Sequence, residues 1–278
     1  MLGKVVINGV TVAYSLEGDP ASPVVVFSNG LAADQSMWAP QAASLLRSYR
    51  VLRYDTRGHG GTAATPGDYS IALLAQDLLA LIDTLGLHRV HFVGLSLGGM
   101  VGQLLGIDHG SRLLSLTLCA TMSDSPTAVW ATRVEAVRKH GVASVADATI
   151  ERWFTRAYEL ANPDMMVRMR AMVINTSQDG YAGCAAAIRD MKLAAGIGAI
   201  KVPTLVIAGA QDTSTPLPVL ETIADSIAGA QLVTIADAAH MPNLEKPAQV
   251  TDAIEGFLSR LPRDAASAPR RLSEGPTR

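Results

Sequence analysis

The sequence contains few of the residues that mark several common protein classes. Aromatic residues make up only 5% of its 278 residues, and cysteine occurs twice, at Cys119 and Cys184. Two cysteines provide neither a metal-ligand spacing nor a disulfide framework, so we expect two reduced core thiols in a cytoplasmic protein. Lysine and arginine form no basic block, and the formal net charge is −2. The sequence therefore predicts no nucleic-acid partner, because phosphate binding requires such a block.

Long apolar runs are also missing. No stretch reaches the roughly 18 apolar residues that a transmembrane helix requires, and the segment Met1 to Lys4 lacks the features of a secretory signal peptide. We therefore expect no membrane partner and a cytoplasmic location. Apolar residues are nevertheless abundant, at 49% against 17% charged. A chain of this length buries enough of them to fold without a metal or a disulfide.

Short apolar runs alternate with longer helical patterns in the first part of the chain. The runs over 24–27, 51–54 and 90–93 are predicted strands, and the first of them is rich in β-branched residues. From residue 71 to residue 85 the apolar residues recur with helical spacing. This alternation predicts an α/β fold with a mostly parallel central sheet and helices on both faces.

The alternation stops over residues 121–198, where every periodic segment is helical, and it resumes with a strand over 204–208. A helical block between two α/β blocks is typical of an insertion that covers one edge of a sheet. We therefore predict an α/β core over 1–120 and 199–261 and a helical lid between them. Residues 262–278 are rich in Pro, Ala, Ser and Arg and lack periodicity, which predicts a disordered tail.

One motif predicts a nucleophilic serine. The segment Gly94-Leu95-Ser96-Leu97-Gly98 follows a predicted strand and precedes a predicted helix. This is the G-x-S-x-G pattern of a nucleophile elbow, where the turn is too tight for large residues on either side of the serine. The helix N-terminus directs free N–H groups at a developing anion. We therefore predict Ser96 as a nucleophile and the Leu97 N–H as one oxyanion donor.

A nucleophilic serine needs a base and an acid that orients the base, and in this fold they follow in the order Ser, Asp or Glu, His. Asp212 lies just after the strand over 204–208, and His240 lies on the loop after the next predicted strand. We predict His240 as the base and Asp212 as the acid. Asp237 is the competing carboxylate, which we expect on the surface. His59 precedes the nucleophile in a glycine-rich loop, so we expect it to support that loop.

The second oxyanion donor is expected on the loop after the strand over 24–27. That loop reads Ser28-Asn29-Gly30-Leu31. Gly30 lets the backbone approach a substrate, which makes the Leu31 N–H the candidate donor, and Asn29 can brace the loop through its amide. The competing interpretation is an ordinary polar turn.

These motifs resemble those of the α/β-hydrolase family from residue 5 to about residue 261, and within it those of the 3-oxoadipate enol-lactonases. The resemblance rests on the stretches Arg53–Gly60, Gly94–Gly102 and Gly180–Met191. The third stretch lies in the predicted lid, the part in which such enzymes diverge. After Asn29 the chain departs from the enol-lactonase pattern, with Gly-Leu-Ala in place of Ser-Leu-Gly, but a backbone donor remains at Leu31.

The resemblance implies hydrolysis of a small carboxylated enol-lactone through an acyl-enzyme on Ser96, in the β-ketoadipate pathway of aromatic catabolism, with no metal and no organic cofactor. A carboxylated substrate requires a cation in the pocket. The predicted lid offers Arg133, Arg138, Arg152, Arg156, Arg168, Arg170, Arg189 and Lys192. Arg189 is favoured because it lies in the third resembling stretch, although a surface pair with Asp190 is the alternative. Trp130 and Trp153 are candidate pocket walls, with core packing as the alternative for each.

Other functions stay open at this level. A carboxylesterase for a neutral small ester, or a perhydrolase, would use the same Ser, His and Asp, so only the pocket decides. A non-catalytic small-molecule receptor can also keep this fold, and turnover that disappears in Ser96→Ala would rule it out. An epoxide hydrolase or haloalkane dehalogenase would need Asp as nucleophile, which Ser96 argues against. The sequence makes no prediction of oligomeric state.

Overall fold

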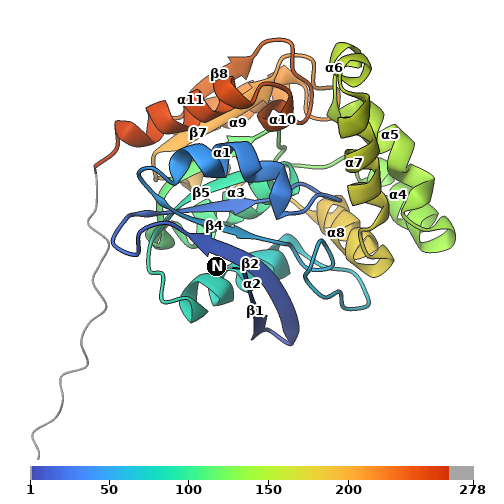
Figure 1. The fold of residues 1–278 in the computed structure, drawn as a ribbon, viewed down its shortest axis with the longest axis horizontal. Helices are drawn as coiled ribbons and strands as arrows, with labels where there is room; N and C mark the ends of the chain where they lie inside the picture. The colour runs from blue at the N-terminus through green and yellow to red at the C-terminus, as the bar shows by residue number, and fades with distance from the viewer. Residues whose placement is uncertain (1, 263–278) are drawn as a thin grey trace, which may run out of the picture.

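A computed structural model describes residues 2–262 and contains one eight-stranded sheet with helices on both of its faces (Figure 1). The strand order is β1-β2-β4-β3-β5-β6-β7-β8; β2 is antiparallel to β1 and β4, and all other neighbours are parallel. The predicted α/β fold is therefore confirmed. The strands are β1 (Leu2–Ile7), β2 (Val10–Glu17), β3 (Val24–Ser28), β4 (Arg50–Tyr54), β5 (Val90–Leu95), β6 (Leu113–Cys119), β7 (Thr204–Gly209) and β8 (Gln231–Ile235).

The α-helices surround this sheet. None of those within residues 2–262 has the length and apolarity needed to cross a bilayer. The predicted disordered tail lies outside the described residues from residue 263 onward. The helices are α1 (Ala39–Leu45), α2 (Ile71–Thr84), α3 (Leu97–Asp108), α4 (Thr127–His140), α5 (Ala143–Trp153), α6 (Arg156–Ala161), α7 (Pro163–Ile174), α8 (Gln178–Asp190), α9 (Leu217–Ser226), α10 (Pro242–Glu245) and α11 (Pro247–Ser259).

The central strands are continuous apolar runs because both faces of the sheet are covered. Every residue of β3, β5 and β7 is buried. Phe27 contacts Trp38, next to α1, with 4.9 Å between ring centroids, whereas Phe92 contacts Gly102 of α3. Since Phe92 pairs with Val26 across the strands, Phe27 and Phe92 point to opposite faces. Helices therefore pack on both sides of the strands that carry the site.

Five helices, α4 to α8, lie between β6 and β7 in the chain, and Figure 1 shows them together beyond one end of the sheet. We refer to residues 121–198 as the helical insertion. Its short helix α6 has only six residues, too few for an apolar periodicity to indicate it. Thr155 caps the N-terminus of this helix, because its hydroxyl accepts a hydrogen bond from the Tyr158 N–H.

Helix α8 attaches the helical insertion to the core by close backbone contact. A Cβ atom on Gly180 would lie 2.4 Å from the Gly58 Cα, and one on Gly183 would lie 2.7 Å from the Tyr69 ring. The Tyr69 N–H donates to the Gly183 carbonyl at 3.1 Å. These glycines of the third resembling stretch therefore serve packing on the core, because any side chain there would push α8 away.

Candidate active site

The turn between β5 and α3 holds Ser96 in a strained backbone conformation, with φ 53° and ψ −112°. Strain of this kind is concentrated at functional sites. A Cβ atom on Gly94 would lie 2.3 Å from the Gly98 carbonyl oxygen, and one on Gly98 would lie 2.4 Å from that of Ser28. Both flanking positions therefore require glycine. Thr121 lies two residues after β6, and its hydroxyl donates to the Ser96 carbonyl at 2.8 Å, which holds the turn.

The loops after β7 and β8 bring Asp212 and His240 together, with 2.8 Å between Asp212 Oδ2 and His240 Nδ1. Both residues are buried. Asp212 also accepts hydrogen bonds from the N–H groups of Ser214 at 2.7 Å and Thr215 at 3.1 Å. Burial acts to raise the pKa of Asp212, but His240 and the Thr215 hydrogen bonds outweigh it and hold that pKa below its ordinary value. Asp212 is therefore an ionised acceptor that fixes the imidazole through Nδ1.

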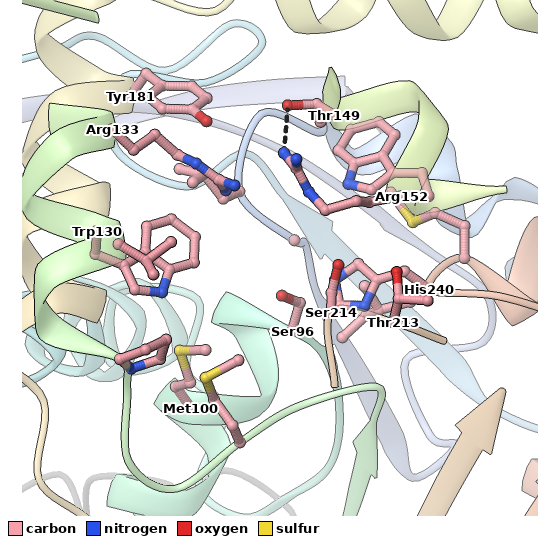
Figure 2. A pocket seen from close by; sticks show the side chains of 18 residues that line it. Ser96, Met100, Trp130, Arg133, Thr149, Arg152, Tyr181, Thr213, Ser214 and His240 are labelled. Carbon is pink, nitrogen blue, oxygen red and sulfur yellow. Dashed lines mark hydrogen bonds between the residues drawn. The ribbon is translucent and has the colours of Figure 1, made fainter. Parts of the chain in front are cut away.

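Ser96 and His240 line the same pocket (Figure 2). Within residues 2–262 no hydrogen bond joins the Ser96 hydroxyl to the imidazole, and catalytic hydrogen bonds are often long in substrate-free enzymes. Asp237, the competing carboxylate, is exposed and accepts a hydrogen bond from Gln211 Nε2 at 3.4 Å instead of contacting His240. The arrangement thus pairs His240 with Asp212 and leaves His240 Nε2 as the nitrogen available to Ser96.

The loop after β3 lies beside Ser96 and presents a free amide. A Cβ atom on Gly30 would lie 3.7 Å from the Ser96 Cβ, so the backbone of this loop passes within van der Waals reach of the serine. In the described part of the chain the N–H groups of Leu31 and Leu97 donate to no acceptor. Leu31 lines the pocket, and Leu97 is the first residue of α3 after Ser96. The structure thus brings both predicted donors to the serine.

Two side chains fix this loop. Asn29 Nδ2 donates to the Tyr54 carbonyl at 3.0 Å, which is the expected brace. His59 Nε2 accepts the Ala32 N–H at 2.9 Å, and Nδ1 contacts the Arg57 carbonyl at 3.1 Å. These contacts require a neutral imidazole with its proton on Nδ1. Burial lowers the pKa of His59 to about 4, which favours that neutral form.

We expect His59 to make stability depend on pH between about 4 and about 6.5. The unfolded chain protonates this histidine near the ordinary pKa of about 6.5, whereas the folded protein does so only near pH 4. Acidification therefore favours the unfolded state. Lowering the pH from 7 to 5 should cost about 2 kcal/mol of unfolding free energy through His59. Urea unfolding of the wild type and His59→Gln at both pH values measures this difference, and equal losses in the two proteins would contradict it.

A cavity of about 240 Å³ lies over Ser96 and His240. Helices α4, α5 and α8 of the helical insertion form the wall opposite these two residues (Figure 2). The predicted wall residues Trp130 and Trp153 both line the cavity. In the described chain no group of three or more His, Cys, Asp or Glu residues could hold a metal ion. From the helical insertion the lining residues are Met122, Pro126, Val129, Trp130, Arg133, Thr149, Arg152, Trp153 and Tyr181.

Arg133 and Arg152 bring two positive charges into this cavity, and Figure 2 shows their guanidinium groups facing one another. Arg133 lies over the Trp130 ring, 4.5 Å from its centroid, and Arg152 donates to the Thr149 hydroxyl at 3.4 Å. Burial and then the charge of Arg133 lower the pKa of Arg152. Among residues 2–262 no carboxylate forms an ion pair with either arginine. Two such cations favour the binding of an anion.

Arg189, the cation favoured from the sequence, does not line the cavity, so the structure does not place it where it would contact a substrate bound at Ser96. Its guanidinium forms ion pairs with Asp68 at 2.9 Å and Asp190 at 2.5 Å, near the C-terminal end of α8. The alternative interpretation, a surface pair with Asp190, describes its position. Of the eight candidate cations, only Arg133 and Arg152 reach the cavity.

Comparisons with known proteins agree with this fold. The family model described as the alpha/beta hydrolase fold matches residues 23–247. 3-Oxoadipate enol-lactonase 1 of Acinetobacter baylyi is 32% identical over 255 residues, which span 91% of this chain and 95% of the relative. The chain therefore belongs to the α/β-hydrolase family.

Solved structures extend the comparison. The enol-lactonase from Burkholderia xenovorans LB400 superposes with a TM-score of 0.91 at 38% identity, covering 92% of this chain and 100% of that one. A thermophilic esterase from Thermogutta terrifontis superposes with a TM-score of 0.87 at 29% identity, covering 93% of this chain and 98% of that one. These findings confirm the resemblance to the enol-lactonases. With the fold, they support the prediction of an enzyme, a carboxylic ester hydrolase similar to the lactonases, that acts on a small molecule.

Proposed function

We propose that this protein is a serine hydrolase that opens a small enol-lactone carrying a carboxylate, converting 3-oxoadipate enol-lactone to 3-oxoadipate in the β-ketoadipate pathway. The observation that carries the proposal is the pair of arginines, Arg133 and Arg152. They share a small cavity with Ser96 and His240 and have no carboxylate partner among the described residues. The enol-lactonases similar to this chain over nine-tenths of its length support the same substrate class.

In the first half of the reaction, Ser96 Oγ attacks the lactone carbonyl carbon while His240 Nε2 takes the hydroxyl proton. The Asp212 carboxylate holds the imidazole and stabilises the imidazolium that forms. The carbonyl oxygen becomes an oxyanion, to which the free N–H groups of Leu31 and Leu97 donate. The ring C–O bond then breaks, and His240 returns its proton to the departing enol oxygen.

In the second half, the enol converts to a ketone. This tautomerisation removes the leaving group from the reverse reaction, so ring opening is effectively irreversible. Because ester and leaving group belong to one ring, the whole molecule stays on Ser96 as an acyl-enzyme. Water attacks the acyl carbonyl while His240 takes its proton, the bond from the acyl carbon to Ser96 Oγ breaks, and His240 returns the proton to Oγ. Every proton and electron pair in these steps is carried by the chain's own residues, the substrate and water.

The helical insertion supplies the specificity in this proposal. It contributes both arginines and both tryptophans of the cavity, whereas Ser96, Asp212 and His240 follow strands of the sheet. We accordingly propose residues 121–198 as a lid over a core formed by 1–120 and 199–261. A guanidinium in a partly dry cavity binds a carboxylate through charge-assisted hydrogen bonds, which are stronger than neutral ones.

Replacing either pocket arginine is expected to lower kcat/KM for a charged substrate and to leave that for a neutral substrate nearly unchanged. In Arg133→Met and in Arg152→Met we expect kcat/KM for 3-oxoadipate enol-lactone to fall on the order of 10- to 100-fold, the value of a hydrogen bond to a charged group. Hydrolysis of p-nitrophenyl acetate, which is neutral, should stay close to wild type. Steady-state kinetics on both substrates measures the difference.

Arg189→Met is the matched control for these variants, because its ion pairs with Asp68 and Asp190 lie outside the cavity. We expect wild-type kinetics on both substrates. An equal fall on the two substrates in the pocket variants would remove the proposed role of Arg133 and Arg152. A fall confined to the lactone in Arg189→Met would restore the assignment made from the sequence.

A carboxylesterase for neutral small esters is the second candidate. The similarity to the thermophilic esterase favours it, and the apolar side chains of Met100, Met122 and Met241 in the cavity suit an uncharged acyl group. Such an enzyme would hydrolyse p-nitrophenyl esters well and the lactone poorly. Such an enzyme would also leave the two guanidinium groups of the cavity without an anion, so it is the second candidate.

A further inference from the structure

Glu245 joins the helical insertion to the loop that carries His240. Glu245 is 6% exposed and is the last residue of the short helix α10. Its Oε1 accepts the Ala239 N–H at 2.7 Å, while Oε2 accepts the N–H and the hydroxyl of Thr155 at 3.1 and 2.8 Å. Ala239 directly precedes His240, and Thr155 follows Trp153 by two residues. One carboxylate therefore spans the gap between a wall of the cavity and the base.

A second contact holds the other side of His240. The Met241 N–H donates to the Trp153 carbonyl at 2.9 Å. The residues before and after His240 are thus both tied to segment 153–155, one directly and the other through Glu245. Trp153 and Arg152 line the cavity. The stretch of chain that would contact a substrate is therefore continuous with the stretch that holds the imidazole in place.

The chemistry of the contact requires a carboxylate. Among residues 2–262 no Lys, Arg or His forms an ion pair with Glu245, and three hydrogen-bond donors surround it instead. A buried carboxylate costs free energy unless its oxygens are satisfied. Both oxygens accept here, whereas a glutamine has one acceptor oxygen and would turn its NH₂ group toward other donors. An amide at this position therefore breaks the link on one of its two sides.

We propose that Glu245 is a positioning residue that sets the place of His240 according to the arrangement of the helical insertion. This inference rests on the proposed function, in which His240 is the base. Asp212 orients the imidazole ring through Nδ1, whereas Glu245 fixes the backbone from which the ring projects. Because Glu245 also accepts from Thr155, the position of segment 153–155 beside the cavity sets the position of the backbone at Ala239, whichever substrate is bound. The link acts on proton transfer and therefore on kcat.

Glu245→Gln is expected to lower kcat about 10- to 100-fold on both the lactone and p-nitrophenyl acetate with little change in KM, because small misplacement of a catalytic group costs this much. Glu255→Gln is the matched control. Glu255 lies on α11, outside the cavity, and its carboxylate accepts a hydrogen bond from the Ser44 hydroxyl at 2.7 Å. Wild-type kinetics are therefore expected for this control. Thr155→Val removes one donor and keeps its N–H, so a smaller fall in kcat is expected. In the double variant Thr155→Val should add little, because both changes break one link.

Kinetics are measured well below the Tm of each variant, so that loss of kcat reports on folded protein. Wild-type kcat in Glu245→Gln, a change in KM alone, or fully additive losses in the double variant would overturn the inference. If Glu245→Gln does not fold, Thr155→Val decides, and an unchanged kcat there overturns it. Ser96→Ala, assayed in parallel, tests the proposed function separately. If Ser96→Ala abolishes turnover while Glu245→Gln keeps full kcat, only the role of Glu245 fails.

Discussion

We expect Ser96→Ala to lower kcat/KM for the enol-lactone by at least about 10⁴-fold, because the oxyanion donors alone retain only a small part of the catalysis. The substitution removes Oγ and leaves the Asp212–His240 pair and the two free N–H groups in place. Hydrolysis of p-nitrophenyl acetate should fall together with that of the lactone, since both need the same nucleophile. Steady-state kinetics with wild-type and variant enzyme measures the loss.

Covalent labelling and product binding test the role of Ser96 independently of kinetics. A fluorophosphonate that labels serine nucleophiles should modify the wild type once and leave Ser96→Ala unmodified, as intact-protein mass shows. Binding of 3-oxoadipate to Ser96→Ala should persist, because Arg133 and Arg152 are unchanged. Turnover that persists in Ser96→Ala would contradict the acyl-enzyme mechanism. Binding by a wild-type protein that has no turnover at all would instead indicate the non-catalytic receptor.

Asp212→Asn is expected to lower kcat by about 10⁴-fold, the scale of the same change in other Ser-His-Asp enzymes. The carboxylate accepts hydrogen bonds from His240 Nδ1–H and from the N–H groups of Ser214 and Thr215. An amide offers its NH₂ group to one of these donors, favours the wrong imidazole tautomer and leaves the imidazolium without a counter-charge. Kinetics on p-nitrophenyl acetate measures the fall in kcat.

Asp237→Asn is the matched control, since it makes the same substitution three residues from His240. Asp237 is exposed and contacts Gln211 rather than the imidazole, so we expect wild-type kcat. If Asp237→Asn lost activity and Asp212→Asn kept it, the two carboxylates would exchange roles and the account of the His240 loop would be wrong.

The residues that could be located from the sequence are those fixed by short-range geometry. Ser96 sits in a turn whose neighbours must be glycine, and Asp212 and His240 each follow an apolar strand in a known chain order. Their meeting at one edge of the sheet follows from parallel strands that end at the same side. The assignment of Leu31 likewise follows from one strand and one glycine, because a backbone donor does not depend on side-chain identity.

The arginines that line the cavity could not be identified from local sequence patterns. Arg189 pairs with Asp68, a partner 121 residues away in the chain, and no local pattern indicates that contact. Arg133 and Arg152 reach the cavity because α4 and α5 pack with one particular helical face toward Ser96. Glu245 and Thr155 are likewise 90 residues apart. Contacts of this kind depend on how the helical insertion docks on the core.

The hairpin of β1 and β2 carries a signal that the strand predictions did not use. Asn8 and Gly9 both have positive φ, at 46° and 73°, and they join two antiparallel strands. Asn-Gly between apolar runs is the strongest short-range indicator of a two-residue hairpin turn. β2 was thus predictable from two residues, whereas the six-residue helix α6 is too short for any periodicity to indicate it.

In the proposed reaction, the Ser96 site and the carboxylate-binding pair Arg133 and Arg152 act on one substrate. The most direct measurement compares wild-type kcat/KM for 3-oxoadipate enol-lactone with that for the methyl ester of its side-chain carboxylate, which keeps the ring and removes the charge. We predict that methylation lowers kcat/KM on the order of 10²-fold in the wild type, because two guanidinium groups lose their partner. It should have little effect in the Arg133→Met/Arg152→Met variant. Equal kcat/KM values for the two lactones in the wild type, with fast hydrolysis of p-nitrophenyl acetate, would contradict carboxylate recognition by the two arginines and identify a carboxylesterase.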